Sequence, residues 1–138
     1  MSALDKLASR QGIKGDVPNQ ELARQLASDQ DRQGIKEIVQ GLCSANKAVQ
    51  SDCIKVLYEI GYLEPELIAD YTGDFIRLLN SRNNRLVWGA MIALWTVARI
   101  QAADLFKARE QIKSAIDQGS VITMDAGIKA LAETAADA

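Results

Sequence analysis

Few residues of this chain could do chemistry, and those few point to binding rather than to catalysis. The sequence holds no histidine, which removes the commonest general base and the commonest metal ligand of proteins. Its two cysteines, Cys43 and Cys53, are too few for a zinc site without other ligands. We expect both to be buried small apolar side chains, with a disulfide or a reactive thiol as the alternative. The sequence thus predicts no enzyme, no metal and no cofactor.

The other polar motifs have simple structural interpretations. Asp29 and Asp31 stand in a polar segment, and two carboxylates there are typical of a solvated helix start. Gly12 and Gly15 belong to a short segment, which indicates a turn rather than a loop that cradles phosphate. Neither motif therefore predicts a function.

The run from Arg85 to Arg99 is the most apolar of the sequence and contains both tryptophans. Trp88, Ile92 and Trp95 are spaced by four and three residues, which places them on one stripe of a helix. Exposed aromatic side chains with arginine beside them are typical of binding hot spots. We therefore predict a partner-binding surface. Its candidate residues are Trp88, Ile92, Trp95 and Arg99 on the stripe, with Arg85, Tyr58 and Tyr62 nearby.

The same stripe has a second interpretation. A central helix of a stack is buried on more sides than a terminal one, and a helix that is apolar all round usually belongs to the core. Trp88 would then be covered by the N-terminal segment or by the linkers. Both interpretations stay open. If the stripe is a surface, its partner is either another protein or peptide, or a second copy of this chain.

The overall composition is that of a globular helical domain. Of the 138 residues, 48% are hydrophobic, 25% charged and 5% aromatic, and so few aromatic residues favour helix over sheet. The formal net charge of -2 implies no general attraction to nucleic acid or to a membrane. The longest apolar run, Leu86 to Ala98, is shorter than the roughly 20 residues that span a bilayer. Because the first residues lack the pattern of a signal peptide, we expect a cytoplasmic protein.

Apolar periodicity and capping signals predict a series of helices. We expect a short helix over 2–10, a loop over 11–18, and helices over 19–28, 31–44 and 47–61, the last ended by Gly61. A short helical linker over 64–71 follows, with Pro65 in its first turn.

The pattern then recurs at a constant offset of 37 residues. Ile38 maps onto Phe75 and then onto Ile112, so an apolar residue keeps its place. Small residues recur at 53, 90 and 127, and polar turn residues recur at 46, 83 and 120. A pair of helices of this length buries too little on its own, whereas stacked pairs build one continuous core. We therefore predict an internal repeat.

The second helices of these pairs carry a family likeness. The residues that carry it are Val49, Cys53 and Val56-Leu57, then Leu86, Ala90 and Ala93-Leu94, then Thr123, Gly127 and Ala130-Leu131. They resemble the second helix of HEAT repeats, over about residues 31–135. HEAT repeats often have an arginine after the first of these residues, and here Gln50, Val87 and Met124 stand there. The resemblance is therefore to HEAT-like or armadillo-like repeats in general.

The resemblance implies an all-α fold, a right-handed α-α superhelix (solenoid) of about three helix-pair repeats with an N-terminal helical cap. Residues 1–30 would be the cap, and 31–138 would hold three HEAT-like repeats, at about 31–71, 72–108 and 109–138, as one folded unit. The last helix has no separate polar capping helix, which solenoids usually need. We expect either that this is the front part of a longer chain or that the last face meets another subunit.

Such solenoids mostly bind proteins or peptides, so we expect a non-catalytic protein–protein interaction scaffold that binds through the second-helix face of the middle repeat. One alternative is nucleic-acid binding resembling that of HEAT-like DNA glycosylases. Arg77, Arg82, Arg85 and Arg99 cluster around the middle repeat, and a tryptophan could stack on a base. The acidic balance of the chain disfavours that alternative. Another alternative is an accessory subunit of an enzyme, similar to those that resemble bilin lyases. No membrane partner is expected.

Overall fold

The computed structural model describes residues 2–137, including the side chains of residues 2–120 and 122–134. All regular structure in this range is helical, which confirms the prediction of an all-α chain. The chain divides into two compact units, Met1–Ile68 and Ala69–Ala138.

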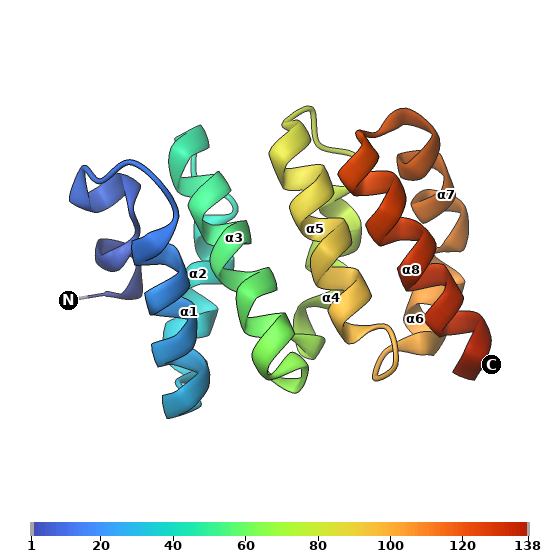
Figure 1. Ribbon diagram of the computed structural model, residues 1–138, viewed down its shortest axis with the longest axis horizontal. Helices are drawn as coiled ribbons and strands as arrows, with labels where there is room; N and C mark the ends of the chain where they lie inside the picture. The colour runs from blue at the N-terminus through green and yellow to red at the C-terminus, as the bar shows by residue number, and fades with distance from the viewer. Residues whose placement is uncertain (1, 138) are drawn as a thin grey trace. The chain divides into compact units, whose positions relative to one another are not determined.

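The first unit is built around its longest helix. Its elements are η1 (Ala3–Lys6), η2 (Ser9–Gln11), α1 (Val17–Asp29), α2 (Arg32–Gly41), α3 (Lys47–Leu63) and η3 (Pro65–Leu67). α1 and α3 lie side by side, with α2 behind them (Figure 1). Asp31 caps α2, because its Oδ1 accepts the backbone N–H of Gly34 at 2.9 Å. The predicted role of Asp31 at a helix start is thereby confirmed.

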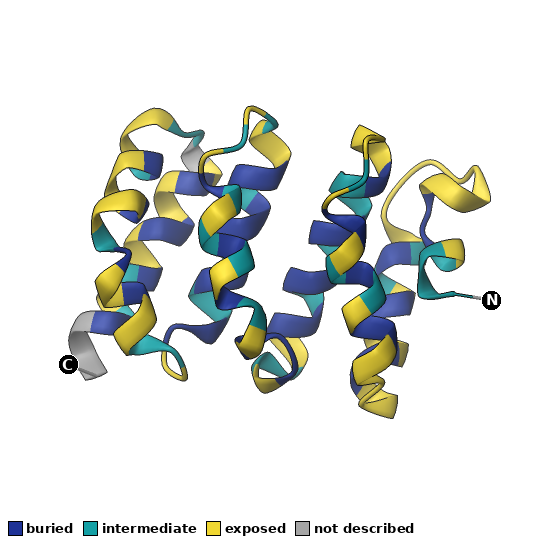
Figure 2. Cartoon of the chain, turned by 180° about the vertical axis from the view of Figure 1, so that it is seen from behind, coloured by how far each residue is buried: buried dark blue, intermediate teal, exposed yellow. Residues whose placement is uncertain are grey.

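The second unit, like the first, has two layers of helices. Its elements are η4 (Ala69–Tyr71), α4 (Thr72–Leu78), α5 (Asn84–Val97), α6 (Ala102–Lys107), α7 (Arg109–Gln118) and α8 (Val121–Asp137). α5 packs most extensively against α8 and also against α4, while α6 and α7 lie behind α8 (Figure 1). Within each unit, buried residues recur along every long helix between exposed ones (Figure 2).

The starts of three helices reproduce the offset seen in the sequence. α3, α5 and α8 begin at Lys47, Asn84 and Val121. The residue before each supplies a side-chain acceptor for the first turn. Asn46 accepts from the N–H groups of residues 48 and 49, Asn83 accepts from that of residue 85, and Ser120 accepts from that of residue 123. Such acceptors satisfy backbone donors that an α-helix leaves unpaired at its start.

We expect Asn83→Ala to lower the free energy of unfolding of the second unit by about 1 kcal/mol, because the N–H of Arg85 loses its acceptor. Asn84→Ala, at an exposed neighbouring position that is not the cap, should change it by less than about 0.5 kcal/mol. Urea denaturation followed by the fluorescence of Trp88 and Trp95, both in α5, measures the two variants. Equal losses would show that Asn83 does not act as the cap.

Two predicted elements differ in detail. The helix expected over 2–10 is replaced by η1 and η2, because Leu7 between them is extended (φ -64°, ψ 149°) and its side chain is fully buried. Gly61 does not end α3, which continues to Leu63, and Gly61 is buried inside it. The residue before a proline avoids the helical conformation, so Glu64 before Pro65 is where the helix stops.

Candidate functional site

The stripe predicted on the apolar run lies on α5 and is neither fully exposed nor fully buried. One side of α5 is core: Ala90, Ala93, Leu94 and Val97 are fully buried. Trp88, Ile92 and Trp95 are each partly exposed, and Arg85 and Arg99 at the two ends are exposed. The sequence left a core and a surface interpretation open. Each of the three apolar side chains is partly buried in the core and partly exposed at the surface.

The C-terminal half of the stripe is bordered by polar side chains of α8. Lys129 Nζ lies 5.2 Å from the centroid of the Trp95 ring, a cation–π distance. Arg99 Nε donates to Glu133 Oε2 at 2.7 Å. Lys129 also pairs with Asp125 at 2.9 Å. The border of Trp95 is therefore a line of alternating charges rather than a basic patch.

Equivalent positions on the other long helices are polar. Residues 51 and 125 correspond to Trp88, and residues 55 and 129 correspond to Ile92. They are Ser51, Lys55, Asp125 and Lys129, and each of them is partly or fully exposed. Comparison of residues 37 positions apart therefore identified helix positions that face solvent and that are apolar on α5 but polar on α3 and α8. The prediction did not include Lys129 and Glu133, which border the stripe.

The two predicted tyrosines lie on α3, in the first unit. Tyr62 is 50% exposed, whereas Tyr58 is buried, with 6% of its surface accessible. Their ring centroids are 5.9 Å apart in an edge-on arrangement, and Lys55 Nζ lies 5.0 Å from the Tyr58 ring centroid. Burial raises the pKa of both phenols above the ordinary value, so both hydroxyls stay protonated at neutral pH. Of the two, Tyr62 is therefore the residue that a partner could reach.

The two cysteines have opposite environments. Cys53 is fully buried, as predicted, and burial raises the pKa of its thiol to about 12, which keeps it protonated and unreactive. The same prediction is wrong for Cys43, which is exposed. Cys43 lies after the end of α2 at Gly41, where the chain turns. It therefore does not continue the buried stripe of that helix. Both thiols are free.

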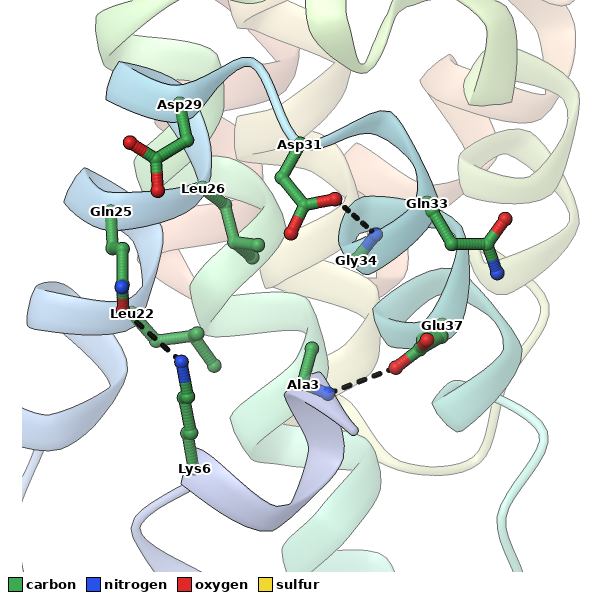
Figure 3. Close-up of a pocket in the computed structure, with 10 residues that line it drawn as sticks. All are labelled: Ala3, Lys6, Leu22, Gln25, Leu26, Asp29, Asp31, Gln33, Gly34 and Glu37. Carbon is green, nitrogen blue, oxygen red and sulfur yellow. Dashed lines mark hydrogen bonds between the residues drawn. The ribbon is translucent and has the colours of Figure 1, made fainter. Parts of the chain in front are cut away.

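A hollow of about 160 Å³ in the first unit has no counterpart in the sequence prediction (Figure 3). Its polar side chains hold the N-terminal segment in place. Lys6 Nζ donates to Gln25 Oε1 at 3.4 Å, and the N–H of Ala3 donates to Glu37 Oε2 at 2.9 Å. Among the described residues, no three or more cysteine, aspartate or glutamate side chains are grouped so that they could hold a metal ion. The hollow is accordingly explained by the docking of η1.

Comparisons with known proteins define the fold and nothing finer. No protein-family model matches the chain, and no curated protein matches it. A crystal structure described as an engineered protein, from the Northeast Structural Genomics Consortium, is similar with a TM-score of 0.70 and 19% identity. The match covers 97% of this chain and 62% of the engineered chain, so this chain spans less than two thirds of that protein's length. At this identity the similarity establishes an all-α fold alone. Within the described residues, no helix has the length and apolar character needed to cross a membrane.

Proposed function

We propose that this chain is a non-catalytic protein–protein interaction module whose helix pairs form a HEAT-like or armadillo-like solenoid. The recurrence of helix starts at Lys47, Asn84 and Val121, each preceded by a capping side chain, supports the repeat. A second support is the burial of the residues that the offset relates, since Ile38, Phe75 and Ile112 are all fully buried. Equivalent side chains in equivalent environments are the signature of a repeated packing unit.

The stripe on α5 is the surface we propose for binding. The observation that carries the proposal is the partial exposure of Trp88, Ile92 and Trp95 at positions that are polar on α3 and α8. Leaving two tryptophans partly in water forfeits hydrophobic stabilisation that a partner would recover, at roughly 25 cal/mol per Å² of apolar surface covered. Trp and Arg are the residue types most enriched at interface hot spots. Arg85 and Arg99, at the two ends of the stripe, supply the second of these types.

The charges around the stripe favour a protein or peptide over a nucleic acid. Arg99 is paired with Glu133, and Asp125 accompanies Lys129 beside Trp95. Carboxylates at the border repel phosphates, whereas a protein partner can present complementary charges of both signs. Tyr62 on α3, in the first unit, is exposed as well, and we propose it as a separate aromatic contact residue, with the Tyr58 ring edge-on against its own.

The test compares the native chain with Trp88→Asp, a substitution that places a carboxylate on the proposed surface. Affinity capture from a lysate with mass spectrometry, together with light scattering of the pure chain, reports a foreign partner and self-association. We expect the native chain to bind a partner for which the Trp88→Asp variant has at least tenfold lower affinity. The circular dichroism spectrum of the variant should match that of the native chain.

Two controls make the result specific. Val17→Asp introduces the same charge at a side chain that is 61% exposed in α1, and it should keep the partner. Arg85→Glu changes an exposed end of the stripe without touching the core, and it should weaken the same partner. Retention of every captured protein by both Trp88→Asp and Arg85→Glu would count against the proposed surface.

A further inference from the structure

The register of α5 and α8 determines which of their residues face each other. The two helices lie side by side and run in the same direction (Figure 1). Arg99 of α5 pairs with Glu133 of α8, which stands 34 positions further along the chain. Trp95 meets Lys129 at the same offset. Within this helix pair, residues at that offset therefore lie beside each other.

The same register places Ile122 of α8 beside Trp88 of α5, at the end of the pair where both helices begin. Ile122 stands two turns before Lys129 on the same line of α8. It is 47% exposed, while Trp88 and Ile92 are partly exposed. These three apolar side chains form one surface that spans the two helices. We call Trp88, Ile92 and Ile122 the α5–α8 patch.

The charges around the α5–α8 patch are unequally compensated. The two carboxylates that α8 places on this side, Asp125 and Glu133, each form an ion pair with a cation of α5 or α8. Arg85, in the first turn of α5, is exposed, and so is Arg82 in the turn before it. Among the residues whose side chains the structure describes, no ion pair joins Arg82 or Arg85 to a carboxylate. Two positive charges therefore remain uncompensated next to the patch.

We propose that the partner of the stripe on α5 is an acidic peptide segment, which packs apolar side chains on the α5–α8 patch and pairs its carboxylates with Arg85 and Arg82. This inference rests on the proposed function and adds the chemistry of the partner. A guanidinium holds a carboxylate through two parallel N–H donors, which gives the pair a defined geometry. A basic peptide would be repelled by both arginines, while the carboxylates that could attract it are already paired.

A peptide fits this distribution of charge better than a nucleic-acid strand. Phosphates recur along the whole of a strand, so a strand that meets Arg85 would also pass the carboxylates of Asp125 and Glu133. A peptide can confine its acidic residues to one end and present apolar residues to the patch. The helix rises about 15 Å between residues 85 and 95, a length that about five residues of an extended peptide cover. A short segment is therefore enough.

Selection from a randomised peptide library displayed on phage tests the chemistry of the partner directly. We expect the native chain to enrich peptides that combine aspartate or glutamate with aromatic or aliphatic residues. Trp88→Asp removes this enrichment. Arg85→Glu exchanges it for peptides rich in lysine or arginine, because the reversed charge attracts the opposite sign. Circular dichroism verifies that each variant remains helical.

Fluorescence polarisation with a labelled peptide from the native selection measures the size of the effect. Arg85→Glu lowers the affinity for this peptide by about tenfold or more, and Arg85→Gln lowers it less. Replacing the acidic residues of the peptide by their amides weakens its binding to the native chain in the same way. The matched control is Arg24→Glu, at an exposed arginine of α1 in the first unit, which keeps the affinity within about twofold.

The outcomes separate this inference from the proposed function. Enriched peptides that Trp88→Asp loses but that carry no excess of acidic residues would overturn the acidic partner and leave the interaction module standing. Displacement of the labelled peptide by a thymidine oligonucleotide at low salt would overturn it in favour of a nucleic acid. Identical selections by the native chain and Trp88→Asp, or no enrichment by the native chain, would contradict both proposals.

Discussion

Phe75→Ala lowers the free energy of unfolding of the second unit by about 3–5 kcal/mol, the loss typical of a large buried side chain cut back to alanine. Phe75 is fully buried in α4, which packs against α5. Truncation removes the transfer free energy of the ring and leaves a cavity that neighbouring helices fill only in part. Urea denaturation followed by tryptophan fluorescence measures the effect, because both tryptophans lie on α5 in the same unit.

The neighbouring residue provides the control for Phe75. Ile76 is apolar and only partly buried, so Ile76→Ala should lose less than half as much free energy as Phe75→Ala. A loss for Phe75→Ala no larger than that for Ile76→Ala would contradict the assignment of Phe75 to the core.

Asn19→Ala lowers the free energy of unfolding of the first unit by about 2–4 kcal/mol, because it breaks a buried polar network. Asn19 is fully buried in α1, and its Oδ1 accepts the N–H of Ala8 at 3.0 Å. Its Nδ2 donates to Asp52 Oδ1 at 2.8 Å, and the other oxygen of Asp52 accepts the N–H of Ser9 at 2.9 Å. One asparagine thus joins the N-terminal segment to α3, and alanine leaves the donor of a buried amide unsatisfied.

Two measurements separate this network from a general loss of packing. Far-UV circular dichroism in urea gives the change in stability, and hydrogen exchange of the Ala8 and Ser9 amides reports whether the N-terminal segment detaches first. Gln20→Ala, next to Asn19 but only partly buried, should change the stability by less than about 0.5 kcal/mol. If the two amides exchange no faster in Asn19→Ala than in the native chain, the network does not hold this segment.

The elements of the fold were predictable because their signals are local. Apolar residues such as Val49, Cys53 and Val56 mark one face of a helix whatever lies beyond it. Asn46 and Asn83 cap the helices that follow them through hydrogen bonds spanning two or three residues. Helix type and start therefore followed from the sequence, while the break at Leu7 did not, because burial of that side chain depends on residues far along the chain.

The candidate site was predictable only in outline. The sequence by itself determined that Trp88, Ile92 and Trp95 share a stripe, because the spacing of a helix fixes which residues align. Only the tertiary structure decided what borders them: the ammonium group of Lys129 beside Trp95 and the pairing of Arg99 with Glu133. The same holds for the polar network of Asn19. These contacts join residues more than ten positions apart, and such contacts depend on how helices pack, which the local periodicity of a sequence does not encode.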